Sequence, residues 1–127
     1  MPIRRVTIIG TGVIGASWAA LYLAKGLELV ATDIAPNAEA ALKRFVYAAW
    51  PALKRLGLAP GASQSNLSFT PKIEAAVSGT DLVQENGPER LDFKQKLYGQ
   101  LNGLLPPEVR AFKGHAAFQH VPESWEF

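Results

Sequence analysis

The sequence has 127 residues, of which 48% are apolar and 19% charged, a composition typical of one globular domain. A chain of this length is too short for a complete two-domain enzyme, and the absence of cysteine excludes disulfides, thiolate catalysis and cysteine-ligated metals. Thirteen Lys and Arg against eleven Asp and Glu leave a net charge of +2, which is too small for a nucleic-acid-binding surface.

The first part of the chain predicts a strand, a helix and a second strand. Val6–Ile9 is a run of β-branched residues, as expected for a strand buried on both faces. Val13–Lys25 is an alanine-rich helix that ends at Gly26, a residue suited to the turn after a helix. Leu27–Thr32 is a second apolar strand, and Asp33 follows it. Together these elements predict a βαβ unit, whose crossover is right-handed in nearly all proteins.

The same region has an alternative interpretation as an export signal or a membrane anchor. Arg4 and Arg5 precede the uncharged stretch Val6–Ala24. The glycines and hydroxyl side chains of this stretch make transfer into a bilayer less favourable, and a second patterned segment follows it directly. We therefore expect a cytoplasmic protein that does not associate with membranes.

The next part of the chain predicts a long helix followed by shorter elements. The helix opens at Pro36 and Asn37 and continues to Leu56, and Pro51 is expected to kink it or to divide it into two helices near Trp50. After a loop we expect a strand at Leu67–Thr70, a short helix at Ile73–Val77 and a buried strand at Leu82–Gln84. A further helix is expected to open near Pro88 and to end between Gly103 and Pro107.

The alternation of strands and helices predicts an α/β fold of the Rossmann type, with a parallel sheet and helices on both faces. The regular pattern covers residues 1–107 and stops there, because residues 108–127 show neither a strand nor a helix period. We therefore expect a dinucleotide-binding domain followed by an atypical tail, and a sheet that is incomplete relative to the full six-stranded form.

A glycine-rich motif, G-T-G-V-I-G, lies between the first strand and the first helix. Gly10 permits a tight turn, Gly12 lets the backbone approach a pyrophosphate, and Gly15 allows the helix to pack closely against the strand. The free amides and the dipole of the helix N-terminus favour an anion there. The residues predicted to bind a dinucleotide pyrophosphate are Gly10, Thr11, Gly12, Val13, Ile14 and Gly15. The alternative is that the glycines serve only a tight turn.

Asp33 indicates which dinucleotide is bound. A carboxylate at the end of the second strand accepts hydrogen bonds from the adenosine ribose hydroxyls and repels a 2′-phosphate. The residues that follow, Ile34, Ala35 and Pro36, supply no arginine for that phosphate. We therefore predict NAD rather than NADP, with FAD as an alternative because FAD-binding folds use the same motif. A role of Asp33 as the cap of the following helix is compatible with cofactor binding.

Four stretches within residues 3–107 carry a family resemblance. They read V-T-I-I-G-T-G-V-I-G-A-S-W-A, L-V-A-T-D, A-A-W-P-A-L-K-R-L-G-L-A-P-G-A-S and D-L-V-Q-E-N-G-P-E-R-L-D-F-K. They resemble the NAD-binding domain of L-3-hydroxyacyl-CoA dehydrogenases, a family that includes carnitine dehydrogenase-like and lambda-crystallin-like branches. The segment around Trp50 and Pro51 is most similar to the carnitine dehydrogenase-like branch. The resemblance implies an NAD-dependent oxidoreductase of fatty acid metabolism, which oxidises a secondary alcohol to a ketone.

The same resemblance implies that Glu89 and Lys94 lie near the nicotinamide half of NAD, although a first-turn acid and a solvated lysine are the ordinary interpretations. The family holds CoA with a serine and a lysine, and the matching positions here are Ala49 and Leu56. Neighbouring cations are present only at residues 54–55. A small 3-hydroxy acid such as carnitine is therefore an alternative to a CoA thioester.

The catalytic residues of the family are not recognisable after Pro107. His115 lies in a sequence that only faintly resembles the family's catalytic histidine motif, and the serine-bearing strand that should precede it is missing from the pattern. His115, His120 and Glu123 have poor spacing for a metal site, and we expect none. We leave the catalytic residues unassigned and expect NAD binding without turnover by this chain alone. The alternative is a non-catalytic NAD-binding module, and an uncovered sheet edge predicts a homo-oligomer.

Overall fold

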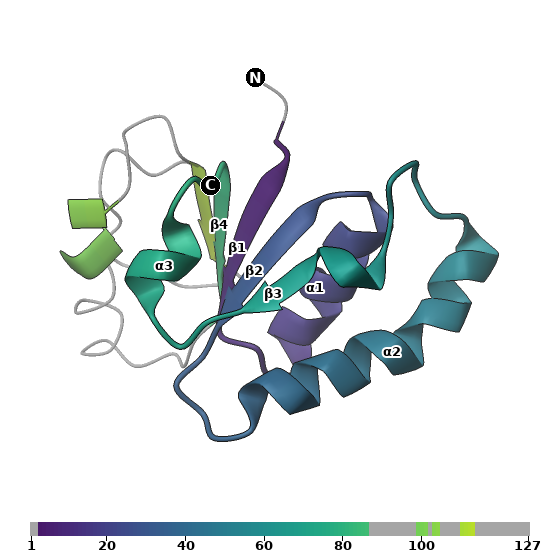
Figure 1. Ribbon diagram of the computed structural model, residues 1–127, viewed down its shortest axis with the longest axis horizontal. Coiled ribbons are helices and arrows are strands. Elements are labelled where there is room, and N and C mark those ends of the chain that lie inside the picture. The colour runs from purple at the N-terminus through teal and green to yellow at the C-terminus, as the bar shows by residue number, and fades with distance from the viewer. Residues whose placement is uncertain (1–2, 87–98, 102, 105–109, 114–127) are drawn as a thin grey trace.

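The computed structural model describes residues 3–86, 99–101, 103–104 and 110–113, and in them five parallel strands form one sheet of order β3-β2-β1-β4-β5 (Figure 1). The strands are β1 (Arg5–Ile9), β2 (Glu28–Thr32), β3 (Leu67–Phe69), β4 (Leu82–Glu85) and β5 (Arg110–Lys113). The described helices are α1 (Val13–Ala24), α2 (Ala38–Leu56) and α3 (Ile73–Val77), and a short 3-10 turn, η1 (Gln64–Asn66), precedes β3. This is the Rossmann-type architecture that the sequence predicts.

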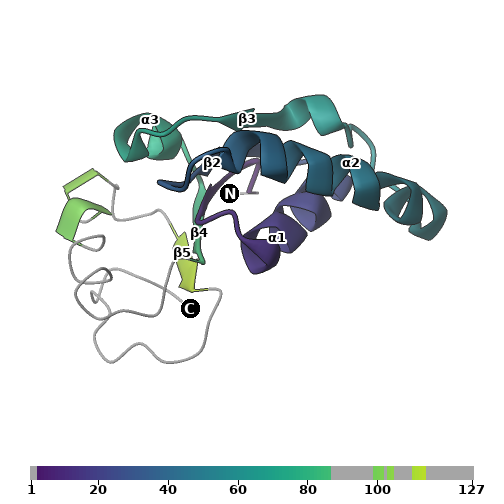
Figure 2. The same cartoon turned by 90° about the horizontal axis from the view of Figure 1, so that it is seen from below.

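Helices cover both faces of the sheet. Figure 2 shows α1 and α2 on one face, and α3 with the helical residues 99–101 and 103–104 on the other. This arrangement follows from the strand order, because right-handed crossovers that move from β1 to β3 place their helices on one face, and crossovers that move back place theirs on the opposite face. Most of the predicted fourth helix lies outside the described residues.

The core lies between the sheet and the pair α1 and α2. Val6 of β1 is paired with Leu29 on one side and with Leu82 on the other, so that all three strands present apolar side chains at the same level. Small residues on α1 let the helix lie close to the sheet. The buried cluster consists of Val6, Ile8, Ala16, Ala19, Ala20, Leu23, Leu29, Ala31, Leu42, Val46 and Leu82.

Two elements differ from the sequence-based expectation. Pro51 lies inside α2, which is one continuous helix from Ala38 to Leu56, so the expectation of two separate helices is wrong. The helix continues because its apolar stripe packs on α1 and the sheet on both sides of the proline. The second difference is β5, a strand in the tail for which no pattern was found. It pairs with β4 through backbone hydrogen bonds, which require no particular side-chain period.

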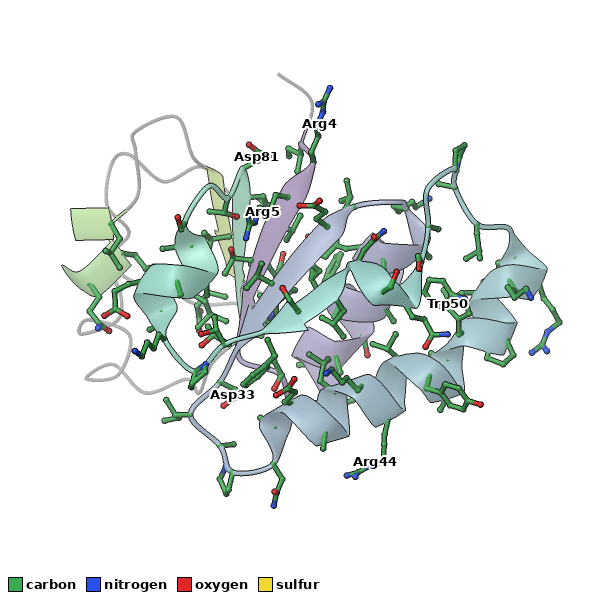
Figure 3. All side chains as sticks on the ribbon, viewed as in Figure 1. Arg4, Arg5, Asp33, Arg44, Trp50 and Asp81 are labelled. Atoms are coloured by element: carbon green, nitrogen blue, oxygen red, sulfur yellow. The ribbon has the colours of Figure 1, made fainter. Side chains whose placement is uncertain are left out.

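The parallel order brings the carboxyl ends of β1, β2 and β4 together at one edge of the sheet. Figure 3 shows Asp33 at this edge, whereas Arg4 and Asp81 lie at the opposite edge, where the Asp81 carboxylate accepts the backbone amides of Arg4 and Arg5. β1 is also where the chain order reverses, since β2 follows it on one side and β4 lies on the other. Open α/β sheets bind ligands at such a switch point.

Among the described residues, no helix has the length and hydropathy needed to span a bilayer.

Candidate dinucleotide-binding site

The glycine-rich loop leaves β1 through a turn that requires glycine. Gly10 has a φ of 91°, in the left-handed region that disfavours side chains. Its amide donates to the carbonyl of Thr32 at the end of β2, with a distance of 2.9 Å. The start of the loop is therefore fixed to the neighbouring strand, and the first helical residues of α1 follow directly.

Gly15 is required by packing. A Cβ at this position would collide with the backbone carbonyl oxygen of Gly10 and would lie 3.5 Å from the side-chain amide of Asn86. The close contact is thus between α1 and the turn that precedes it, rather than between α1 and the body of a strand. Because the colliding atom belongs to the backbone, it has no side-chain rotation with which to move away.

Gly12 differs from the other two glycines, because the fold does not require it. It is the N-cap residue of α1, with a φ of −63° that any amino acid adopts, and no described atom lies within 4 Å of an added Cβ. The space beside Gly12 is open and faces solvent. A glycine in a position without steric or conformational need for one fits a backbone surface that a ligand approaches closely.

The N-terminus of α1 is free of side chains that would compete with an anion. No described side chain caps the helix, and its first turn contains no acidic residue. Val13 and Ile14 in this turn are 75% and 41% exposed. The amides of the first turn have no partner within the helix, and together with the helix dipole they could hold a phosphate group. These observations fit a dinucleotide pyrophosphate.

Asp33 lies beside this loop and is held by it. Its Oδ2 accepts the backbone amide of Thr11 at 2.6 Å and the Thr11 hydroxyl at 3.0 Å, and its Oδ1 accepts the backbone amide of Ala35 at 3.0 Å. Burial by itself would raise the pKa of Asp33, but these hydrogen bonds and one from the Ile34 backbone hold the pKa below its usual value. The carboxylate is therefore ionised at neutral pH and fixed in direction.

Asp33 does not cap the following helix. The N-cap residue of α2 is Asn37, in the left-handed conformation with a φ of 59°, and its side chain makes no capping hydrogen bond. The alternative role of Asp33 as the cap of this helix is therefore not observed, because α2 starts at Ala38. The carboxylate instead organises the loop after β2 through Ala35.

A cavity of about 680 Å³ opens next to Asp33, between the loop after β2 and the segment after β3. Ile34, Ala35, Phe69 and Pro71 contribute apolar surface to it. The sequence analysis identifies none of these four as site residues, because β2 and β3 are brought side by side only by the tertiary structure. Their common signal is that each lies at or near the end of a predicted strand.

Asn86, directly after β4, is a further residue that the sequence analysis does not select. Its backbone amide donates to the carbonyl of Ile9 at 2.7 Å, which ties the end of β4 to the end of β1. Its side-chain nitrogen is buried next to Gly15 and has no hydrogen-bond partner among the described residues. The sequence feature that could have identified Asn86 is its position directly after the buried strand β4, which pairs with β1.

Several of the remaining residues that the sequence analysis weighed for a functional role are not described by the structure. Glu89, Lys94, His115, His120 and Glu123 lie outside the described residues. Of the two positions that match the CoA-holding residues of the family, Ala49 packs against the core and Leu56 is 85% exposed at the end of α2.

The fold and the glycine-rich loop define a dinucleotide-binding domain of the Rossmann type. Residues 5–110 match the family described as 3-hydroxyacyl-CoA dehydrogenase, NAD binding domain. The match extends over most of the sequence, so the chain belongs to this family of NAD-binding domains. The cofactor of the family is NAD, as the sequence predicts.

The similar proteins are dehydrogenases. An L-carnitine dehydrogenase of Streptomyces coelicolor is 50% identical over 107 residues, which are 84% of this chain and 34% of that protein. One from Pseudomonas aeruginosa is 49% identical over 107 residues, again 84% of this chain and 33% of that protein. The chain thus spans about a third of the length of these relatives.

The similar solved structures include dehydrogenases as well. A 5-formyl-3-hydroxy-2-methylpyridine 4-carboxylic acid 5-dehydrogenase, an NAD-dependent dismutase, has a TM-score of 0.77 and 36% identity over 88% of this chain and 37% of its own. The 3-hydroxybutyryl-CoA dehydrogenase of Escherichia coli K12 has a TM-score of 0.77 and 26% identity over 89% of this chain and 25% of its own.

Proposed function

We propose that this chain is the cofactor-binding part of an NAD-dependent dehydrogenase that acts on a 3-hydroxy acid of the carnitine type or on a 3-hydroxyacyl-CoA. One observation carries the proposal: the open backbone at Gly12 and the first turn of α1 lies beside an ionised carboxylate, Asp33, held by the same loop. An anion site next to a hydrogen-bond acceptor matches the pyrophosphate and the adenosine ribose of NAD.

The roles of the residues follow from their chemistry. The first-turn amides of α1 bind the pyrophosphate without a cationic side chain, because the helix dipole and unpaired N–H groups stabilise the charge. Asp33 accepts hydrogen bonds from the ribose and disfavours a 2′-phosphate by charge repulsion. Bound NAD supplies the acceptor for a hydride from the alcohol carbon of the substrate. From the family resemblance, Glu89 and Lys94 lie near the nicotinamide half.

The substrate proposal favours a small 3-hydroxy acid. Ala49 and Leu56 stand where the acyl-CoA enzymes have the serine and the lysine that hold CoA, and neither side chain donates a hydrogen bond or carries a charge. The relatives at about half identity are L-carnitine dehydrogenases, whereas the 3-hydroxybutyryl-CoA dehydrogenase is 26% identical. A 3-hydroxyacyl-CoA remains the second candidate because the matching family is described by that substrate.

We propose that the chain alone binds NAD without turnover. Oxidation of an alcohol requires a base for the hydroxyl proton, and no residue of the chain is assigned to that role. The chain also spans about a third of its relatives. A non-catalytic NAD-binding module is the second candidate function. Mixing the chain with the remaining two thirds of a related carnitine dehydrogenase separates the two, since restored NADH formation with carnitine supports a dehydrogenase part.

Calorimetric titration with NAD and NADP tests the cofactor proposal. The expected result is tighter binding of NAD than of NADP by the unmodified chain and a loss of that preference in Asp33→Ala, because the variant neither accepts the ribose hydroxyls nor repels the phosphate. Asp81→Ala is the matched control, since its carboxylate lies at the opposite edge of the sheet and should leave the preference unchanged (Figure 3). Equal affinities for both cofactors before any substitution contradict the proposed role of Asp33.

Three further expectations from the sequence are part of the proposal. We propose a cytoplasmic location, a role in fatty acid metabolism and self-association into a homo-oligomer. The third is supported by apolar residues that are partly exposed on the outer side of α1, with Ile14, Trp18 and Leu21 each about two-fifths exposed. Light scattering measures the mass in solution, and a uniform monomer contradicts the proposed oligomer.

A further inference from the structure

Thr11 lies in the middle of the phosphate-binding motif, but its side chain faces away from the site of the phosphate. It is 8% exposed, and both of its donors, the backbone amide and the hydroxyl, are directed to the same atom, Oδ2 of Asp33. The two residues are 22 positions apart in sequence. The parallel register, which pairs Ile9 with Thr32, places the residues after the two strands side by side.

The hydrogen bonds determine how much of Asp33 is left for a ligand. An ionised carboxylate has roughly four acceptor positions on its two oxygens. Thr11 uses two of them on Oδ2, and the amide of Ala35 uses one on Oδ1. Thr11 thus fills both positions on Oδ2. The Ile34 backbone also donates to this carboxylate, so a ribose hydroxyl approaches Oδ1 and shares it with the backbone amides that follow Asp33.

The two donors of Thr11 differ in how much they depend on the identity of the residue. Any residue except proline supplies the backbone amide at this position, whereas only threonine or serine supplies the hydroxyl. A residue without the hydroxyl leaves Oδ2 with one partner instead of two and allows the carboxylate to turn about its last torsion. The side chain of Thr11 is therefore the part of the loop that fixes the direction of Asp33.

We propose that Thr11 is a positioning residue for cofactor choice, whose hydroxyl holds Oδ2 of Asp33 inward and thereby directs Oδ1 to the adenosine ribose. This inference rests on the proposed function, because it assigns to Asp33 the role of ribose acceptor. It also predicts that the pyrophosphate loop and the ribose acceptor act as one rigid unit, since Gly10 is bonded to Thr32 in the same segment.

The test is a comparison of Thr11→Val with Thr11→Ser by calorimetric titration with NAD and with NADP. Valine keeps the shape of threonine and removes the hydroxyl, whereas serine keeps the hydroxyl. Thr11→Val should bind NAD roughly fivefold to tenfold more weakly, because the released carboxylate must be turned back toward the ribose, with a much smaller change for NADP. Thr11→Ser should retain the preference within about twofold.

A second arm shows whether Thr11 acts through Asp33. In an Asp33→Ala background, Thr11→Val should cause no further loss of NAD affinity, because the group that it positions is absent. The same loss in both backgrounds overturns the inference, and so does an equal loss for NAD and NADP or a serine variant that behaves like valine. If Thr11→Val does not fold, as judged by circular dichroism, Thr11→Ala removes the same hydroxyl and carries the same comparison.

The inference and the proposed function fail in different ways. An unmodified chain that binds neither dinucleotide contradicts the proposed function. If the unmodified chain prefers NAD and the Thr11→Val variant prefers NAD to the same degree, the proposed function is left intact and the role of Thr11 is overturned.

Discussion

Alanine substitutions at Gly12 and Gly15 should separate cofactor binding from stability, although the two glycines are three residues apart. An added Cβ at Gly12 meets no described atom within 4 Å, and the φ of −63° suits alanine. An added Cβ at Gly15 collides with the backbone carbonyl of Gly10. The same chemical change is therefore harmless to the fold at one position and harmful at the other.

The change in the free energy of unfolding that we expect for Gly12→Ala is the sum of two opposing effects. Alanine is a poorer N-cap residue than glycine, which costs about 0.5–1 kcal/mol. Alanine also reduces the entropy of the unfolded chain, which stabilises the fold by about 0.4–1 kcal/mol. The net change should therefore lie within about 1 kcal/mol of zero. Its methyl group would occupy the open space beside the first turn of α1.

The expected effect of Gly12→Ala on NAD binding is large. A methyl group between the pyrophosphate and the first-turn amides removes at least one hydrogen bond to a charged group, a loss of about 1.5–3 kcal/mol. This corresponds to NAD binding that is at least roughly tenfold weaker. Gly15→Ala should instead lower the free energy of unfolding by about 1–3 kcal/mol, because the carbonyl of Gly10 must shift.

Urea unfolding followed by circular dichroism measures the stability of each variant, and calorimetric titration measures its NAD affinity. Wild-type NAD affinity in Gly12→Ala would refute the assignment of the open space to the pyrophosphate. Wild-type stability in Gly15→Ala would refute the close approach between α1 and the Gly10 turn. Gly57→Ala is not a suitable control, since its φ of 104° introduces strain of its own.

Three further predictions concern the pH dependence and the helices. The lowered pKa of Asp33 should make the chain less stable as the pH falls from the ordinary value of 3.8 through the lower folded value, and Asp33→Asn should flatten this acid limb in pH-dependent unfolding. Pro51→Ala should raise the free energy of unfolding by about 1 kcal/mol, because it restores a helical donor at an exposed position of α2; a less stable variant in urea unfolding would contradict this. Leu23→Ala should lower the same quantity by about 2–5 kcal/mol, because Leu23 is fully buried between α1 and the sheet, and a loss below about 1 kcal/mol would show a loosely packed core.

The local elements and the cofactor class were determined by the sequence. Runs of β-branched residues, alanine-rich helical periods and the glycine spacing act over a few residues, so they predict β1, α1 and β2 within one or two positions. The same local signals identify the loop at residues 10–15 and the acid at Asp33. They indicate a dinucleotide-binding domain. The resemblance of four sequence stretches indicates the 3-hydroxyacyl-CoA dehydrogenase family, to whose NAD-binding domains the chain belongs.

The contacts between distant segments were decided only by the tertiary structure. The bond from Thr11 to Asp33 depends on how β1 and β2 are aligned, and no residue pattern encodes an atomic distance across strands. The continuity of α2 through Pro51 has the same origin, because packing against α1 and the sheet overrides a local preference. Such alignments arise from many weak apolar contacts acting together, and they exist only once the sheet has formed.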